Sequence, residues 1–544
     1  MLFVTRPWPE VGILKRESRI VYMNGRFVTL DDSRPSAGAV AVRGGRFVAV
    51  GPTAGALEAA GPGASVCDLR GLTVVPGFID SHLHFASYGL GLQDVDLSGA
   101  ASVREILSLI GRRASLSAAG EWVVAHGYNH LALAESRHPS RTELDFATPR
   151  NPVYLRHSSG HLCVVNSAAL RLAAIDRETP DPEGGVIGRD AAGEPDGVLH
   201  ESAQMLVRRL RLPHARDQLV RAIALANAEL VKRGVTSCHE ARAGRLAPDE
   251  VEAYIEASRR GLLQIRVHLM ADGTTGAGGR PSPEWAALPG DDRALSGGTV
   301  KFFADGSILT GTAAFSGDGR WAPVRLGEIE SLREAVRNGW RVAVHAIGDL
   351  AVDAAVTAIA SEATGGRSRA KRHRIEHCGL PSRIAVEMMA RMGIMAVGEP
   401  SFVAGSGDDY ESLLGRARAE RLFPVASLLR AGIRVAFGTD LPASRSTPVR
   451  AIHDAVNRST PSGNVLGGGE RIGALQALRC MTSEGAHASM EERIKGVIRP
   501  GMLADFAVLS DDITRTAPES IGQATVVATV IGGEPVFGAP DLGW

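Results

Sequence analysis

The segment PGFIDSHLHF, residues 76–85, contains a short apolar strand that ends in two histidines. Similar apolar runs recur along the chain, and helical patterns separate them. We place eight strands, at residues 78–84, 235–240, 265–270, 299–306, 341–348, 373–378, 394–400 and 434–440. Strands that alternate with helices indicate parallel βαβ units, and a (β/α)8 TIM barrel requires eight of them. We therefore predict an α/β fold built on a TIM barrel.

The two ends of the chain carry a different pattern. Short β-branched runs broken by Asn-Gly, Gly-Gly and Pro-Gly precede the barrel, and β character returns after about residue 486. Because neither end is long enough to bury a sheet alone, we predict that residues 18–74 and 486–540 pack together as a small composite β-sandwich domain. The barrel domain then covers residues 75–485, and the long stretch 95–217 is predicted to be a subdomain inserted near the barrel mouth.

Composition excludes several classes of protein. The 544 residues contain 60 Lys+Arg and 60 Asp+Glu, so no net field favours nucleic acid or an anionic membrane. The sequence has no run of 18 apolar residues, and its first residues, MLFVTRPWPEVGILKRES, are broken by prolines and charges. Five scattered cysteines without a CxxC spacing fit reduced thiols. We expect a cytoplasmic enzyme with neither nucleic-acid nor membrane partners; a homodimer is favoured only because dimers are common among soluble proteins.

Polar side chains stand at or near the ends of the predicted barrel strands. They are His82, His84, Lys301, His345, His377 and Asp440. Side chains two apart on a strand face the same side, and barrel active sites form at the carboxyl ends of the strands. Taken singly, an HxH pair is more often two partly solvated side chains, and a strand-end aspartate often caps a turn. Together these groups would be costly to bury in one cavity unless a metal satisfied them, so we predict a metal site.

The same residues lie in recognisable motifs. PGFIDSHLHF, KFFADGS, VAVHAIGD, RHRIEHC, VAFGTD and RPGMLADFAVL together resemble the amidohydrolase superfamily. The spacing is most similar to amidohydrolase family 3, the YtcJ-like branch, which includes N-substituted formamide deformylase. The resemblance runs from about residue 20 to 540 and implies a metal-dependent barrel with a composite β-sandwich. It implies that His82 and His84 bind a more buried metal, that His345 and His377 bind a more exposed one, and that Asp440 serves the buried metal and the reacting water.

Lys301 has two interpretations. A protonated ammonium offers no lone pair to a cation, whereas a lysine carbamylated by carbon dioxide carries a carboxylate that can bridge two ions. In binuclear members of the superfamily a fourth-strand lysine is carboxylated in this way. The alternative is a cationic lysine paired with Asp305 beside a single ion. We expect two zinc ions, although nitrogen and oxygen ligands also suit iron, manganese or cobalt.

The predicted activity is metal-dependent hydrolysis of a C–N bond other than a peptide bond. The substrate class is a small amide or N-substituted formamide, attacked by a metal-activated hydroxide while Asp440 moves the proton. One alternative is a mononuclear deaminase of the same superfamily, against which Lys301 argues. The other is a non-catalytic scaffold, against which the complete ligand set argues.

Further residues are candidates for substrate contact or for support. The stretch NPVYLRHSSGHLCVVNSAAL, residues 151–170, resembles a family segment near the substrate, so His161 and Asn166 are pocket candidates, although a histidine in an apolar run is more often a core residue. Glu201 and Asp305 complete the predicted substrate-binding residues.

Other polar residues near the site have structural interpretations. Asp80 either orients a ligand imidazole or is structural, and Arg374 is expected to be structural and to point away from the pocket. For His239 and His268 we favour packing. The sequence departs from the family pattern at GYNH, residues 127–130, and at SILTGTA, residues 307–313, which leaves the substrate identity open.

Overall fold

The computed structural model describes residues 19–157, 162–182, 185–273, 294–317, 319, 321–362 and 367–538. The chain forms two compact units. One contains the barrel and both chain ends, and the other consists of Gly89–Ala222 with Leu246–Pro248. The predicted insert of residues 95–217 lies within this second unit, and the other predicted domain boundaries stay predictions.

The predicted barrel is present, with all eight strands in the expected order. Every neighbouring pair in this sheet is parallel. The strands are β8 (Phe78–Leu83), β15 (Val235–Ala243), β16 (Arg266–Asp272), β17 (Leu295–Phe303), β18 (Arg341–Ala346), β19 (Arg374–His377), β20 (Met395–Gly398) and β21 (Val435–Phe437). The strands are buried on both faces, as β8 is along its whole length, which is why they appear in the sequence as continuous apolar runs.

The first and last strands meet and close the barrel. The backbone N–H of Asp440, just after β21, donates a hydrogen bond to the carbonyl of His82 on β8 at 2.7 Å. Gly438 allows this approach, since a Cβ there would lie only 2.6 Å from the Cβ of His82. The closure places residues of the first and last strands beside one another.

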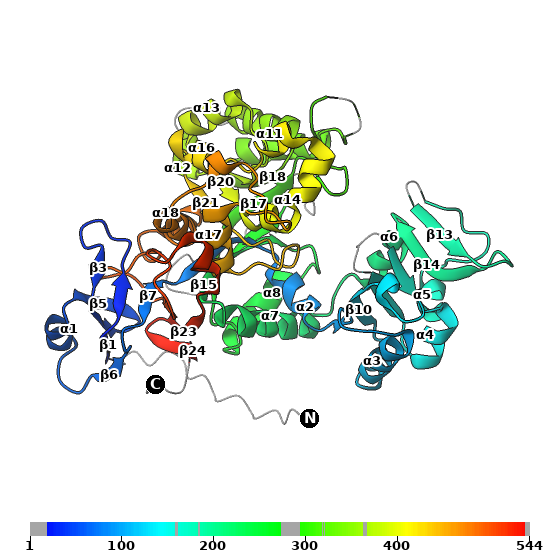
Figure 1. Ribbon diagram of the computed structural model, residues 1–544, viewed down its shortest axis with the longest axis horizontal. Coiled ribbons are helices and arrows are strands. Elements are labelled where there is room, and N and C mark those ends of the chain that lie inside the picture. The colour runs from blue at the N-terminus through cyan, green and yellow to red at the C-terminus, as the bar shows by residue number, and fades with distance from the viewer. Residues whose placement is uncertain are drawn as a thin grey trace. The chain divides into compact units, whose positions relative to one another are not determined.

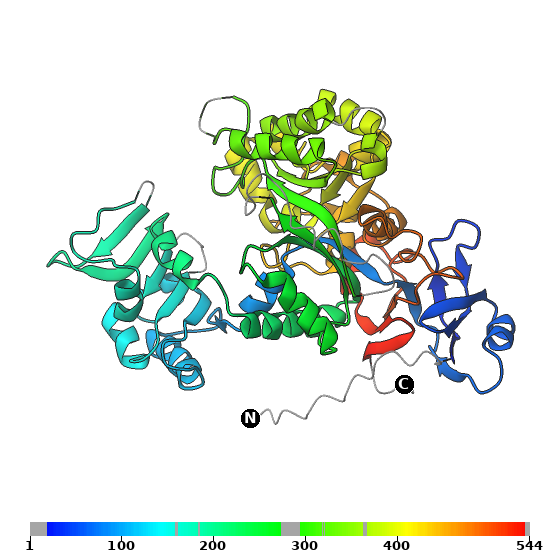
Figure 2. The ribbon, with the colours of Figure 1, turned by 180° about the vertical axis from the view of Figure 1, so that it is seen from behind.

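Helices pack against the outside of the barrel strands (Figure 2). In the unit that holds the barrel they are α8 (Glu250–Arg259), α10 (Leu326–Arg337), α11 (Asp349–Glu362), α12 (Arg367–Lys371), α13 (Arg383–Met392), α14 (Ser401–Leu414), α15 (Arg416–Ala419), α16 (Val425–Arg430), α17 (Pro448–Asn457), α18 (Ala474–Cys480) and α19 (Ser483–Ala488), while α2 (Phe85–Gly91) and α7 (Arg216–Val231) each have residues in both units. The apolar faces of α10, α11, α13, α16, α17 and α18 form one continuous core with residues of β8 and of β17 to β21. Within the described ranges, no helix is both long enough and apolar enough to cross a lipid bilayer.

The two chain ends build one composite β domain, as predicted. In the six-stranded sheet β7 (Thr73–Pro76) from the N-terminal side pairs antiparallel with β22 (Phe506–Leu509) from the C-terminal side, and Figure 1 shows these segments side by side. The same sheet contains β2 (Arg26–Val28), β3 (Ser36–Ala37), β23 (Val526–Ile531) and β24 (Glu534–Gly538). A four-stranded sheet contains β1 (Arg19–Met23), β4 (Ala39–Arg43), β5 (Arg46–Gly51) and β6 (Ser65–Asp68), with α1 (Thr53–Ala60) alongside.

Aromatic and aliphatic side chains hold this domain together. The ring of Tyr22 meets that of Phe506 edge-on, with centroids 4.9 Å apart. The Tyr22 hydroxyl donates to the carbonyl of Gly533 at 2.8 Å, which satisfies its buried polar group. Residues more than 480 apart in sequence therefore share one core.

The second unit has its own six-stranded mixed sheet. The strands are β9 (Val95–Asp96), β10 (Val123–Tyr128), β11 (Val153–His157), β12 (Leu162–Val165), β13 (Gly185–Arg189) and β14 (Pro195–Glu201). The helices α3 (Val103–Ser115), α4 (Arg141–Ala147), α5 (Ser167–Leu172) and α6 (Gln204–Arg208) accompany it. Its buried residues form clusters separate from the barrel core, as expected for an inserted subdomain.

Candidate metal centre

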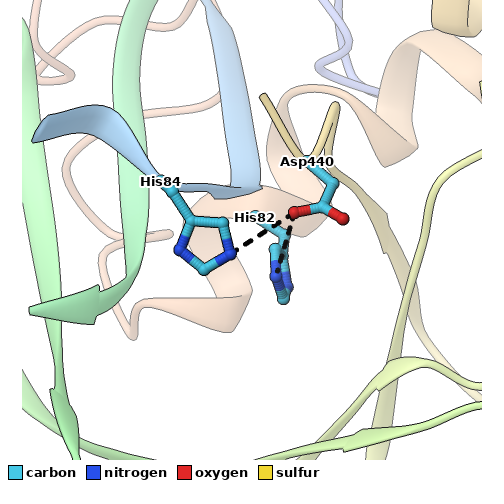
Figure 3. A group of neighbouring side chains, drawn as sticks. All are labelled: His82, His84 and Asp440. Atoms are coloured by element: carbon cyan, nitrogen blue, oxygen red, sulfur yellow. Dashed lines mark ion pairs between the residues drawn. The ribbon is translucent and has the colours of Figure 1, made fainter. Parts of the chain in front are cut away.

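Three of the predicted ligands converge at the carboxyl ends of the first and last barrel strands. His82 lies on β8, His84 follows it, and Asp440 follows β21 (Figure 3). Asp440 Oδ1 lies 3.7 Å from His82 Nε2 and 3.5 Å from His84 Nε2. One potential ligand atom from each residue lies within 4.8 Å of the other two. Imidazole nitrogens and a carboxylate oxygen at this spacing form a donor set for a divalent cation.

Asp440 itself is strained and electrostatically unsatisfied. Its backbone has a φ of 55°, a region that residues with side chains rarely adopt. Burial raises the pKa of its carboxyl group to about 7. Its Oδ1 has no hydrogen-bond partner in the part of the chain that the structure describes. A buried carboxylate oxygen left in this state fits a cation at this position.

Asp80 stabilises the backbone beneath these ligands. Its carboxylate accepts hydrogen bonds from the Thr439 hydroxyl at 2.6 Å, from the Thr439 N–H at 3.0 Å and from the His82 N–H at 3.3 Å. It therefore connects β8 to the loop after β21 and binds no ligand imidazole. Of the two roles considered for Asp80, the structural one matches this geometry.

Lys301 projects from β17 toward the same histidines. Its side chain is fully buried, and its Nζ lies 3.4 Å from His82 Nε2. Burial is the main effect that lowers the pKa of this amine, to about 8. The amine is therefore more readily deprotonated than that of a lysine exposed to water.

Asp305 is engaged in hydrogen bonds with backbone N–H groups. Its carboxylate accepts hydrogen bonds from the backbone N–H groups of Ala314 at 2.9 Å, Ile347 at 3.1 Å and Gly348 at 2.8 Å. These bonds tie together the loops that follow β17 and β18. These bonds give Asp305 a role in organising the loops and do not favour its pairing with a cationic Lys301. The charge state of Lys301 and a contact of Asp305 with substrate stay predictions.

His345 and His377 lie next to one another on the adjoining strands. Their ring centroids are 4.5 Å apart, and the ring of His377 is 4.9 Å from that of His82. Burial lowers the pKa of His377 to about 3 and that of His345 well below its usual value. Both imidazoles are therefore neutral near pH 7 and can offer a lone pair to a cation. The fold thus gathers all six predicted metal-site residues.

Three buried glutamates at this site were missed by the sequence reasoning. One is Glu240 on β15, whose Oε1 lies 3.8 Å from His84 Nδ1, and the other two contact ligand histidines more closely. Glu376 contacts His82 Nδ1, and Glu399 contacts His377 Nδ1 at 2.7 Å. Glu376 stands next to His377 in RHRIEHC, and Glu399 follows β20, so both occupied strand-end positions like those of the predicted ligands. No motif drew attention to them, because their partners come from other strands.

The expected orientation of Arg374 was also wrong. Its guanidinium is fully buried inside the barrel, where it donates to Glu376 Oε1 at 2.5 Å and to the Ser81 carbonyl at 2.5 Å. Arg374 and Glu376 are two residues apart on β19 and share a face, whereas the expectation compared Arg374 with His377. His239 and His268 lie in the same interior, where His268 Nδ1 is 2.9 Å from Ser296 Oγ, which fits the packing role favoured for them.

The remaining predicted substrate-binding residues, Asn166, Glu201 and His161, belong to the inserted unit. Asn166 is buried as the N-cap of α5: its Oδ1 accepts from the Ala169 N–H at 3.1 Å, and its Nδ2 donates to the Asn151 carbonyl at 2.9 Å. These bonds favour a structural role. Glu201 is exposed at the end of β14, so its role in substrate binding stays a prediction. His161 lies outside the described residues.

Residues 65–537, most of the chain, match the amidohydrolase family. The chain belongs to this family. It is 31% identical to the N-substituted formamide deformylase of Arthrobacter pascens, over 94% of this chain and 97% of that protein. It is also 31% identical to the YtcJ protein of Bacillus subtilis, over 88% of this chain and 91% of that one.

The fold of this amidohydrolase also matches a solved structure. That of an uncharacterized metal-dependent hydrolase from Pyrococcus furiosus superposes with a TM-score of 0.75 and 25% identity. The match covers 92% of this chain and all of that one. Family and structural likeness together support a metal-dependent hydrolase.

Proposed function

We propose that this amidohydrolase hydrolyses the C–N bond of a small amide or N-substituted formamide at a centre for two divalent ions. The observation that carries the proposal is the convergence of His82, His84 and Asp440, with the buried Oδ1 of Asp440 lacking a hydrogen-bond partner within the described ranges. The 31% identity to an N-substituted formamide deformylase supports the substrate class.

The residues fit two neighbouring ions, for which zinc is our proposal. His82, His84 and Asp440 would hold one, and His345 and His377 would hold the other. When bound, such ions supply Lewis acidity and lower the pKa of water. The neutral state of the buried imidazoles is what keeps their lone pairs available.

In this proposal, a carbamate on Lys301 bridges the two metal positions. Its neutral Nζ adds to carbon dioxide, an N–C bond forms, and one proton is released, which leaves an anionic carbamate. Full burial of Lys301 and its position 3.4 Å from His82 support this modification, because an unpaired ammonium is costly among imidazoles. The carbamate oxygens would supply the anionic ligand that the neutral histidines lack.

Asp440 is the proposed proton carrier. Its carboxylate accepts a proton from the attacking water as a C–O bond forms at the carbonyl carbon, and delivers it to the leaving nitrogen as the C–N bond breaks. The products are a carboxylic acid, which is formic acid for a formamide, and an amine.

The test combines metal analysis with a substrate screen. We expect two zinc ions per wild-type chain, one or none in Lys301→Ala, and amine release from N-substituted formamides. Ammonia release from amino-heterocycles, with one ion regardless of Lys301, would instead identify a deaminase. Absence of any ion from the purified wild-type protein would favour a scaffold and overturn the proposal.

A further inference from the structure

The metal-site histidines on β8 and β19 each have one ring nitrogen in contact with a buried glutamate. Glu376 contacts Nδ1 of His82, and Glu399 contacts Nδ1 of His377. All four side chains are almost completely buried, so water does not compete for these contacts. The two glutamates belong to neighbouring barrel strands, since Glu376 lies on β19 and Glu399 follows β20.

These contacts determine which nitrogen of each imidazole can bind a cation. A carboxylate accepts a hydrogen bond from an N–H, so it retains the proton on Nδ1 and leaves the lone pair on Nε2. In His82, Nε2 is the atom that faces Asp440 Oδ1 and Lys301 Nζ. The protein therefore selects the tautomer and orientation of these rings by itself.

His345, which is partly buried, is held differently. Nε2 of His345 donates to the carbonyl of Gly306 at 3.0 Å, which leaves Nδ1 as its available atom. A backbone carbonyl carries no net charge, and the carboxylate near His345, Oδ1 of Asp305, lies 3.5 Å from the same Nε2. In this adjoining pair it is His377 whose Nδ1 contacts a glutamate, at 2.7 Å. Glu376 therefore contacts a histidine of the first proposed metal position, and Glu399 contacts a histidine of the second.

The two glutamates also differ in their own surroundings. Glu376 is held by Arg374, which donates to its Oε1 at 2.5 Å and to its Oε2 at 2.8 Å. Glu399 has no hydrogen-bond partner on Oε1 in the part of the chain that the structure describes. Arg374 therefore compensates the charge of Glu376, whereas no arginine among the described residues donates a hydrogen bond to Glu399.

We propose that Glu376 and Glu399 are positioning residues, each controlling the affinity of a different metal position. Glu376 acts through His82 on the position formed with His84 and Asp440, and Glu399 acts through His377 on the position shared with His345. This inference rests on the proposed two-ion function. Removing a carboxylate that orients a ligand histidine typically weakens metal binding 10- to 100-fold.

The test measures zinc affinity site by site, with zinc buffers and a competing chelator. When Glu399→Leu is the only substitution, we expect the affinity for one of the two zinc ions to fall about 10- to 100-fold. Glu399→Gln retains a hydrogen-bond acceptor, so the loss of affinity should be smaller. In a His345→Ala background, where one position is removed, Glu376→Gln weakens the remaining ion while Glu399→Gln leaves its affinity unchanged.

The matched control is Glu491→Gln. Glu491 is buried and pairs with Lys495 at 2.8 Å, so it reports the general cost of removing a buried glutamate charge. Thermal unfolding of each metal-free variant separates a folding defect from an affinity change, and the Gln variants remain informative where a Leu variant does not fold. Cobalt substitution provides an absorption spectrum that changes with ligand geometry.

The outcomes separate the two proposals. Wild-type protein that binds two zinc ions, with unchanged affinities in the Glu376→Gln, Glu399→Gln and Glu399→Leu variants, overturns the positioning roles and leaves the proposed function standing. Equal weakening of both ions by each variant overturns the division between the positions. Wild-type protein that binds no zinc overturns both.

Discussion

Asp440 is the residue in which strain, burial and chemistry coincide. Its left-handed backbone directs the carboxylate toward His82 and His84, and burial raises the pKa of its carboxyl group. A fold retains such an arrangement only where the surrounding contacts enforce it. The neighbouring His377 also has a positive φ, of 66°, so two residues of this site share the left-handed conformation.

Asp440→Asn is expected to lower kcat by about 10²- to 10⁴-fold, because the amide cannot carry the proton. Steady-state kinetics on a formamide identified in the screen measures this effect. Asp408→Asn is the control, since that carboxylate accepts hydrogen bonds from Ser462 and contacts none of the ligand histidines. A rise in KM at unchanged kcat would contradict the proton-transfer role.

His373 provides a pH-dependent term in stability away from the metal ligands. It is buried, its Nδ1 accepts a hydrogen bond from the Val342 N–H at 3.3 Å, and burial lowers its pKa to about 4. The unfolded chain, with a histidine pKa near 6.5, therefore binds this proton first. Stability contributed by neutral His373 is present above pH 6.5 and is lost as the pH falls toward 4.

The expected loss between pH 7 and pH 4 is at most about 3 kcal/mol, from the size of this pKa shift. Urea unfolding of the wild-type protein and of His373→Gln across this range measures it. The variant should have a shallower decline, and parallel curves for the two proteins would exclude His373 as the source.

At the scale of elements, the site depends on the junction between β8 and the end of β21. Asp80 connects the two by hydrogen bonds to Thr439 and His82, and Gly438 lets the backbones approach. The ligands on these strands hold their relative positions because this junction is buried and is held by the hydrogen bonds of Asp80 to Thr439 and His82. When a metal centre is assembled from several strands, the positions of its ligands depend on the pairing that aligns those strands.

Asp80→Ala is expected to destabilise the protein by about 2 to 4 kcal/mol, because buried donors on Thr439 and His82 lose their acceptor. It should also weaken zinc binding at the position of His82 and His84. Denaturant unfolding of the metal-free protein and zinc competition measure the two effects. Destabilisation without any loss of zinc affinity would show that the ligands keep their positions without this connection.

At the scale of the whole molecule, the composite β domain is attached to the barrel through a buried ion pair. Arg266 at the start of β16 contacts Asp505, beside β22, at 2.8 Å and 3.2 Å. Asp505 Oδ1 also accepts the Gly532 N–H at 2.7 Å. These contacts are at the opposite ends of the barrel strands from the metal centre, which indicates a structural role.

Asp505→Ala is expected to cost about 3 to 5 kcal/mol, since it removes a buried carboxylate that pairs with Arg266. The exposed pair Arg383–Glu387 is the control, and Glu387→Ala should change the free energy of unfolding by less than about 1 kcal/mol. Urea unfolding compares the two, and kcat of the folded Asp505→Ala protein should match the wild type. Equal, small effects would show that the domain is held by apolar packing alone.

Much of this architecture could be predicted from the sequence. Buried parallel strands appear as short apolar runs, so all eight barrel strands were found in order, with ends displaced by a few residues. The metal-site residues were found because a strand places alternate side chains on one face and barrel strands deliver their carboxyl ends to one rim. The pairing of the two chain ends followed from the inability of either to bury a sheet alone.

The partners of those residues were decided by the tertiary structure. Glu376 and Glu399 became visible only when β8, β19 and β20 were placed around one axis, because a hydrogen bond between strands leaves no fixed spacing along the chain. The inward orientation of Arg374 and the use of Asp305 by three backbone N–H groups depended in the same way on neighbouring elements. Local periodicity along the chain specifies which strands form and which side chains lie on each of their faces. Closure of the barrel decided which of those side chains touch, since contact depends on distances that local periodicity does not specify.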